Sequence, residues 1–299
     1  MRWRTLPRCS AFVWKDVGYV AHEAAHANHK LDIAVPKATV GKRRLPTCVF
    51  VHGGSWQRGD KSGGLNGGID EAFARAGFIG VSVNYRLSPE VKHPEHARDV
   101  AAAVKWLHDH IETFGGDPER MVLVGHSAGA HLVMQVLADP QFMRDAGLNR
   151  TVAEVVKAAV GISGVYNIVR IANTAVYGDL VVHPMSLSSA TMQIDSTIAS
   201  PAFGDRVEEW RKASIASVVT QAGKESPILR IPLLLITAEQ DFHFEKDAQE
   251  LEKWLVDAGH TRVERQIVRD TNHFTIVQDL TQDGDDHTMA MVKSFIADL

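Results

Sequence analysis

Cysteine, long apolar runs, internal repeats and a charge excess of either sign are all scarce in this 299-residue chain. The two cysteines, Cys9 and Cys48, are too few for a disulfide scaffold, and Cys48 in an apolar run reads as a small core residue. No apolar run approaches the roughly 20 residues of a bilayer-spanning helix. A formal net charge of −4 indicates neither a nucleic-acid partner nor an anionic membrane surface.

The first ten residues carry three arginines but no sustained apolar segment of the kind that secretory signals contain. We therefore expect a reducing, cytoplasmic location and no stable association with membranes.

Short apolar strands alternate with helical stretches along the chain, which predicts an α/β fold with a mostly parallel sheet and helices on both faces. One helix is expected over Ala97–Phe114, where apolar residues recur at three- and four-residue steps. Strands are expected at Leu31–Val35, Cys48–Val51, Phe78–Val83, Met121–Val124, Val155–Ile162, Pro232–Thr237 and Val263–Val268.

The pattern loosens between Gly164 and Ser226, a stretch far longer than the roughly 2–6 residues of an ordinary α/β connection. We interpret it as a cap inserted over the active site. The prediction is one domain, 1–299, with a cap insertion at about 165–226.

The segment Gly125-His126-Ser127-Ala128-Gly129 matches the G-x-S-x-G pattern between a predicted strand and a predicted helix. In that context the serine lies on a sharp, strained turn, and a side chain at either glycine would collide with neighbouring backbone. The Ala128 N–H, at the start of the helix, then points at the oxygen of an attacked carbonyl. We predict that Ser127 is the nucleophile of a serine hydrolase.

The segment His52-Gly53-Gly54-Ser55-Trp56, here called the glycine loop, follows the predicted strand that ends at Val51. A glycine pair lets backbone N–H groups approach an oxyanion closely. Two amides from Gly53, Gly54 and Ser55 are expected to join that of Ala128, and the sequence leaves open which two. His52 is expected to brace the loop, and Trp56 either lines the substrate pocket or packs in the core.

A serine nucleophile needs a base, and the base needs an orienting carboxylate; in α/β-hydrolases the chain order is Ser, then Asp or Glu, then His. Asp241 and His273 each lie just past the end of a predicted strand, where such sheets build their sites. They are the predicted acid and base.

Rival groups stand near both positions. Glu239 is one alternative acid, and Asp247 is another, expected on a helix over 244–258 and facing solvent. His243 is too close to the acid in sequence to serve as its base, and His287 lies in an acidic polar loop.

The segment His22-Glu23-Ala24-Ala25-His26 matches the H-E-x-x-H pattern of zinc peptidases. No extended amphipathic helix surrounds it, and a predicted strand follows almost at once. We interpret it as a polar segment and predict no metal site, with a zinc peptidase as the remote alternative.

Two further features bear on a substrate pocket. Gly63–Gly68, here called the rim loop, is glycine-rich but lacks the ending of a phosphate loop, so we expect it at the pocket rim. Aromatic residues from the cap and from the loop after Asp241 could line a pocket or pack in the core: Tyr177, Phe203, Trp210, Phe242 and Phe244.

The glycine loop resembles the HGGxW motif of kynurenine formamidases (arylformamidases) and related esterases. The elbow sequence GHSAGAH over Gly125–His131 is similar to theirs, as are Ser163–Asn167 and the segment Asn272–Thr281 around the predicted base. The resemblance runs from about Lys30 to the C-terminus and is weakest in the cap. Isoprenylcysteine methylesterases and hormone-sensitive-lipase-like carboxylesterases share the same loop and elbow patterns.

This resemblance implies the triad Ser127, Asp241 and His273, and hydrolysis of N-formyl-L-kynurenine to formate and L-kynurenine, a step of tryptophan catabolism. The alternative is a carboxylesterase or methylesterase. In either case the partner is a small-molecule ester or formamide and no cofactor is required; a homodimer is left open. A non-catalytic binding protein on the same fold is the remote alternative, and the presence of all three triad residues argues against it.

Overall fold

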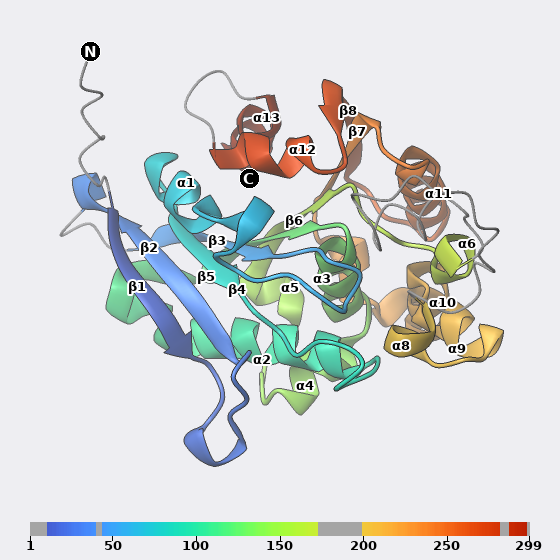
Figure 1. Cartoon of the computed structure of the whole chain (residues 1–299), viewed down its shortest axis with the longest axis horizontal. Helices are drawn as coiled ribbons and strands as arrows, with labels where there is room; N and C mark the ends of the chain where they lie inside the picture. The colour runs from blue at the N-terminus through green and yellow to red at the C-terminus, as the bar shows by residue number, and fades with distance from the viewer. Residues whose placement is uncertain (1–10, 40–43, 173–198, 282–286, 298–299) are drawn as a thin grey trace, which may run out of the picture.

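An eight-stranded sheet runs through the centre of the protein (Figure 1). The structure is a computed structural model that describes residues 11–39, 44–172, 199–281 and 287–297. The strand order is β1-β2-β4-β3-β5-β6-β7-β8. β2 is antiparallel to both of its neighbours, and the strands from β4 to β8 are parallel. The mostly parallel sheet predicted from the sequence is confirmed. The strands are β1 (Ala11–Gly18), β2 (Lys30–Pro36), β3 (Leu45–Val51), β4 (Ile79–Val83), β5 (Gly116–His126), β6 (Val156–Ile162), β7 (Leu233–Gln240) and β8 (Val263–Asn272).

Helices cover both faces of the sheet, which is why its central strands are continuous apolar runs. One face packs against α1 (Ile69–Arg75), α12 (Thr275–Gln278) and α13 (His287–Ala297). The other face packs against α2 (Glu95–His110), α3 (Ala128–Ala138), α4 (Pro140–Asp145), α5 (Val152–Val155) and α11 (Phe244–Asp257). No helix within the described ranges is long and apolar enough to cross a bilayer.

The sequence-based prediction did not include β1, and it placed the start of β5 too late. β1 is an edge strand paired only with β2 in the described chain, and most of its side chains face solvent, so it lacks an apolar run. The helix predicted over 97–114 is α2 followed by a 3-10 turn, Ile111–Phe114. β5 begins at Gly116, ahead of the strand predicted at Met121–Val124, because Gly116 pairs with Leu45 before a register shift.

In the described part of the segment between β6 and β7, four short α-helices lie together on the side of the sheet where α3 packs (Figure 1). α3 holds this group through His131 Nε2 and Gln135 Nε2, which both donate to the carbonyl of Ala213. The predicted cap spans this segment, but residues 173–198, including Tyr177, lie outside the described part. The helices are α6 (Ile168–Ala172), α8 (Ala199–Phe203), α9 (Val207–Ala213) and α10 (Ile215–Ala222).

Asp247 does not face solvent, so the sequence-based expectation for this residue is wrong. It lies in the first turn of α11 with an exposed fraction of 2%. Its Oδ2 accepts hydrogen bonds from the backbone N–H groups of Tyr166 and Asn167, both at 3.2 Å, and its Oδ1 lies 2.7 Å from Arg170 Nη1. The carboxylate therefore ties α11 to the segment that leaves β6, a contact between residues about 80 positions apart.

Burial raises the pKa of Asp247 to about 6, against the partial opposition of Arg170. The carboxyl group of Asp247 thus stays protonated to a higher pH in the folded protein than in the unfolded chain. The stabilisation that this protonated group contributes therefore falls as the pH rises from about 4 to about 6. We expect wild type to lose about 1 kcal/mol relative to Asp247→Asn between pH 5 and pH 7. Urea unfolding of both proteins at both pH values measures their free energies of unfolding. A difference between the two proteins that is the same at pH 5 and at pH 7 would contradict the prediction.

Candidate active site

Ser127 lies between the last residue of β5 and the first residue of α3, with φ 54° and ψ −119°. A positive φ is rare for a residue with a side chain, and its strain persists only where the surroundings impose it. Here the Ser127 N–H donates to the carbonyl of Ile162 at 2.9 Å, which fixes the turn against β6. The strained strand-to-helix turn predicted from the sequence is therefore present.

Both elbow glycines are required by close backbone contacts. A β-carbon on Gly125 would lie 2.5 Å from the Gly129 carbonyl oxygen. A β-carbon on Gly129 would lie 2.1 Å from the carbonyl oxygen of Val51, at the end of β3. Any side chain at these positions would push α3 away from the sheet.

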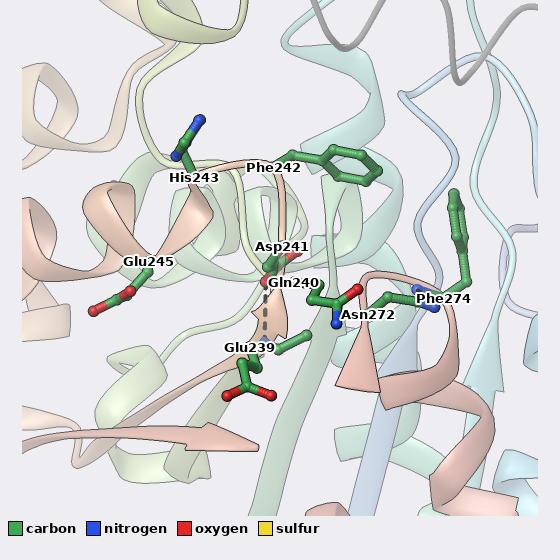
Figure 2. A pocket seen from close by; sticks show the side chains of 9 residues that line it. Glu239, Gln240, Asp241, Phe242, His243, Glu245, Asn272 and Phe274 are labelled. Atoms are coloured by element: carbon green, nitrogen blue, oxygen red, sulfur yellow. Dashed lines mark hydrogen bonds between the residues drawn. The ribbon is translucent and has the colours of Figure 1, made fainter. Parts of the chain in front are cut away.

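Ser127, His273 and Asp241 form a continuous hydrogen-bonded chain. Ser127 Oγ lies 3.1 Å from His273 Nε2, and His273 Nδ1 lies 2.8 Å from Asp241 Oδ1. With the His273 proton on Nδ1, the ring donates to Asp241 and accepts from the serine hydroxyl. The second carboxylate oxygen of Asp241 accepts from the N–H of Ala238 at 3.2 Å (Figure 2).

The three residues come from the carboxyl ends of β5, β7 and β8, where the sequence placed them, and all three are buried. They are 32 and 146 positions apart along the chain, so only the sheet brings them together.

The rival groups are engaged elsewhere. Glu239 is exposed and accepts a hydrogen bond from the N–H of Asp270. His243 precedes α11 in a left-handed conformation and lines a neighbouring cavity (Figure 2). The side chain of His287 lies outside the described part of the chain.

The glycine loop lies directly against Ser127. A β-carbon on Gly53 would lie 2.9 Å from Ser127 Cβ, and Gly54 has a φ of 122°. Ser55 also has a positive φ, and Gly53, Gly54 and Ser55 all line the cavity above Ser127. Their backbone is therefore placed within reach of an oxyanion, together with Ala128, whose N–H is in the first turn of α3 and has no intrahelical acceptor.

His52 braces this loop, as expected. Its ring stacks on Tyr85 with centroids 4.5 Å apart, and its Nδ1 donates to the carbonyl of Gly53 at 2.7 Å. Tyr85 in turn donates its hydroxyl hydrogen to the carbonyl of His52. Burial lowers the pKa of His52, which suits a neutral ring with a structural role.

Trp56 packs in the core and is not among the residues that line the cavity. Its exposed fraction is 1%, and its ring makes edge contacts with His131 and Phe203. Of the two alternatives the sequence left open for Trp56, the structure matches core packing. The loop reverses direction at Ser55 and Trp56, which both have positive φ, and the indole lies in the core against Phe203 of α8.

A cavity of about 790 Å³ opens above Ser127 and His273. Its walls are mostly apolar, and Leu65 from the rim loop, Phe242 and Phe274 are among the residues that line it. A second cavity of about 520 Å³ lies beside Asp241, and Phe242 and Phe274 line it as well (Figure 2). The two phenylalanines therefore stand between the two cavities.

Of the aromatic residues considered from the sequence, Phe242 lines the cavity, and Phe244 is buried with its ring centroid 5.2 Å from that of His273. Phe203 and Trp210 are buried in the core. The rim loop lies at the cavity as expected, and its Leu65 lines the wall. Sequence reasoning missed Phe274, although it directly follows the predicted base, because nothing local in the sequence shows where its side chain points.

The H-E-x-x-H segment does not form the α-helix that zinc ligation by this motif needs. His22–Ala24 is a 3-10 turn, and His26 Nε2 lies 2.8 Å from Glu90 Oε1. The side chain of His22 lies outside the description. Among the described residues, no group of three or more histidine, cysteine, aspartate or glutamate side chains is arranged to hold a metal ion.

Gly53 provides a test of the loop geometry. Gly53→Ala is expected to lower turnover of p-nitrophenyl acetate by about 100-fold or more, because the added methyl group displaces the loop from Ser127 and removing an oxyanion donor costs that much. Gly18→Ala is the control, since a β-carbon there meets no atom closer than 3.9 Å. Equal activity in the two variants would show that this loop has no part in turnover.

Comparison with known proteins agrees with this architecture. Probable carboxylic ester hydrolase LipM of Mycobacterium tuberculosis is 34% identical over 172 residues, which are 58% of this chain and 37% of that protein. A probable isoprenylcysteine alpha-carbonyl methylesterase of Arabidopsis thaliana is 32% identical over 145 residues, 48% of this chain and 33% of that protein. The matched segments thus span about a third of the length of these curated relatives.

The crystal structure of esterase B from Lactobacillus rhamnosis superimposes with a TM-score of 0.74 at 20% identity, covering 96% of this chain and 86% of that one. At that identity the likeness shows the fold, which is the α/β-hydrolase fold. A model of the BD-FAE family matches residues 31–255, more than half of the chain. The chain therefore belongs to the BD-FAE family.

Proposed function

We propose that this protein is a serine carboxylesterase in which Ser127 is the nucleophile, His273 the general base and Asp241 the orienting acid. The observation that carries the proposal is the buried chain of contacts from Ser127 Oγ through both ring nitrogens of His273 to Asp241. A serine in this arrangement can lose its proton to the histidine as it attacks a carbonyl.

The reaction has two stages. His273 Nε2 takes the Ser127 proton as Oγ bonds to the carbonyl carbon, and then gives that proton to the departing alcohol. Water, deprotonated by the same ring, attacks the acyl-enzyme, and the acid leaves as Oγ recovers its proton. Asp241 holds the ring through Nδ1 and stabilises its cationic form.

The negative charge that develops on the carbonyl oxygen needs hydrogen-bond donors. In this proposal the Ala128 N–H provides one, and two of Gly53, Gly54 and Ser55 provide the others. The close approach of Gly53 to Ser127 supports this assignment. None of these steps needs a cofactor.

Ester hydrolysis is favoured over aryl formamide hydrolysis. The curated relatives described above are named as a carboxylic ester hydrolase and a methylesterase. N-formylkynurenine is the second candidate substrate, because the walls at Phe242 and Phe274 can accept an aryl ring beside His273. We also propose that the chain is one hydrolase domain with the segment at about 165–226 as its cap.

The first test compares substrates and removes the nucleophile. The purified protein is expected to hydrolyse p-nitrophenyl butyrate faster than N-formyl-L-kynurenine, and Ser127→Ala should lose both activities by a factor on the order of 10⁴ or more. Ser82→Ala, a buried serine on β4, is the matched control and should retain them. Activity retained in Ser127→Ala would refute the serine mechanism. Faster cleavage of N-formyl-L-kynurenine than of the ester would make the aryl formamide the preferred substrate and contradict the proposed ester preference.

Phe274 tests the apolar wall, since its side chain is 36% exposed and can be truncated with little effect on stability. We expect Phe274→Ala to lower kcat/KM about tenfold for 1-naphthyl acetate relative to ethyl acetate, because an aromatic contact contributes about 0.5–1.5 kcal/mol beyond its buried area. Phe12→Ala, on an exposed part of β1, is the control. Equal losses on both esters would mean that Phe274 does not contact the substrate.

A further inference from the structure

His126, the elbow residue before Ser127, directs its ring at the main chain of His273. Its Nε2 lies 2.9 Å from the His273 carbonyl oxygen, and the two imidazole centroids are 4.7 Å apart. The exposed fraction of His126 is 5%, and it lines the cavity above the nucleophile. The roles proposed above for Ser127, His273 and Asp241 make no use of this contact.

Three segments of the site meet at this ring. His126 is the last residue of β5, and His273 follows β8. The glycine loop after β3 is the third segment, because a β-carbon on Gly53 would lie 2.9 Å from His126 Nδ1. One side chain therefore touches the nucleophile turn, the base and the proposed oxyanion loop.

The hydrogen bond fixes the form of the ring. A carbonyl oxygen only accepts, so Nε2 carries the hydrogen. Burial lowers the pKa of His126 well below its ordinary value, and the neighbouring His273 and His52 lower it further. The ring is therefore neutral, and it adds no positive charge beside His273 when that residue becomes an imidazolium ion.

Two consecutive elbow residues thus hold His273 at two separate points. Ser127 Oγ contacts the ring at Nε2, and His126 contacts the main-chain carbonyl of the same residue. The contacts of Ser127 and Asp241 act on the ring alone, whereas the contact of His126 fixes the main chain of His273 relative to the end of β5. Displacement of a reacting group by about 1 Å can cost about 100-fold in rate.

We propose that His126 is a positioning residue for the hydrolysis: its Nε2–H···O=C bond to His273 sets the base at the distance from Ser127 at which proton transfer occurs. This inference rests on the proposed serine esterase function. It assigns to the variable position of the G-x-S-x-G pattern a role that the pattern itself does not specify.

The test compares His126→Leu with His126→Gln, because glutamine places an N–H close to where histidine Nε2 lies. We expect His126→Leu to lower kcat for p-nitrophenyl butyrate by about 10- to 100-fold with KM changed less than threefold. The acid limb of its kcat/KM profile should move to lower pH, since a displaced His273 is held less well by Asp241. His126→Gln should recover most of kcat and the wild-type acid limb.

His260→Leu is the matched control. His260 is also 5% exposed, and its Nε2 donates to a backbone carbonyl, that of Ile231, at the same 2.9 Å. Its loss should lower stability to urea by a similar amount while leaving kcat and the acid limb unchanged. Where His126→Leu does not fold, His126→Asn replaces it, since its shorter side chain cannot reach the carbonyl.

Wild-type kcat and pH profile in the leucine or asparagine variant would overturn the inference, as would a glutamine variant no better than leucine. The Ser127→Ala variant distinguishes failure of the His126 proposal from failure of the proposed serine esterase function. An inactive Ser127→Ala protein together with fully active His126 variants refutes only the role of His126. An active Ser127→Ala protein refutes the serine mechanism itself.

Discussion

The close approach of α3 to the end of β3 is the constraint on which the rest of the site depends. A β-carbon on Gly129 would lie 2.1 Å from the carbonyl oxygen of Val51, so the helix begins against the sheet with no room for a side chain. This contact forces the reversal at Ser127 and leaves its backbone with a positive φ. It also brings the first amides of α3 beside the glycine loop that follows β3. The proposed nucleophile and the proposed oxyanion donors are thus positioned by one packing contact.

The parallel sheet supplies the remaining parts. Because β5, β7 and β8 all end at the same edge, Ser127, Asp241 and His273 meet there although they are far apart in sequence. Two polar groups buried at this edge are satisfied by contacts with the backbone or with a neighbouring ring: the Asp241 carboxylate accepts from the Ala238 N–H, and the His273 carbonyl accepts from His126. Unpaired, each would cost on the order of 1–3 kcal/mol, so the hydrogen bonds that orient the site also make its burial tolerable.

A second set of contacts ties the segment between β6 and β7 to this core. His131 and Gln135 of α3 share the Ala213 carbonyl, and Asp247 of α11 accepts from the backbone after β6. α3 begins directly after Ser127 and α11 begins shortly after Asp241, so both helices start beside the site. Phe242 and Phe274 directly follow Asp241 and His273 in sequence, so the cavity above Ser127 is built partly by the immediate neighbours of the proposed acid and base.

The sequence by itself determined the α/β architecture, the elbow at Ser127 and the positions of Asp241 and His273 past their strands, because apolar runs and turn glycines report local backbone structure directly. It did not determine the directions of Trp56 and Asp247, the edge strand β1, the cavity wall at Phe274 or the contact of His126 with His273. Each of those is decided by packing between segments far apart in the chain: the first turn of α11 meets the loop after β6, and the end of β5 meets the loop after β8. Such contacts leave no periodic signal, since a side chain's partner is set by the three-dimensional arrangement of the strands rather than by its neighbours in sequence.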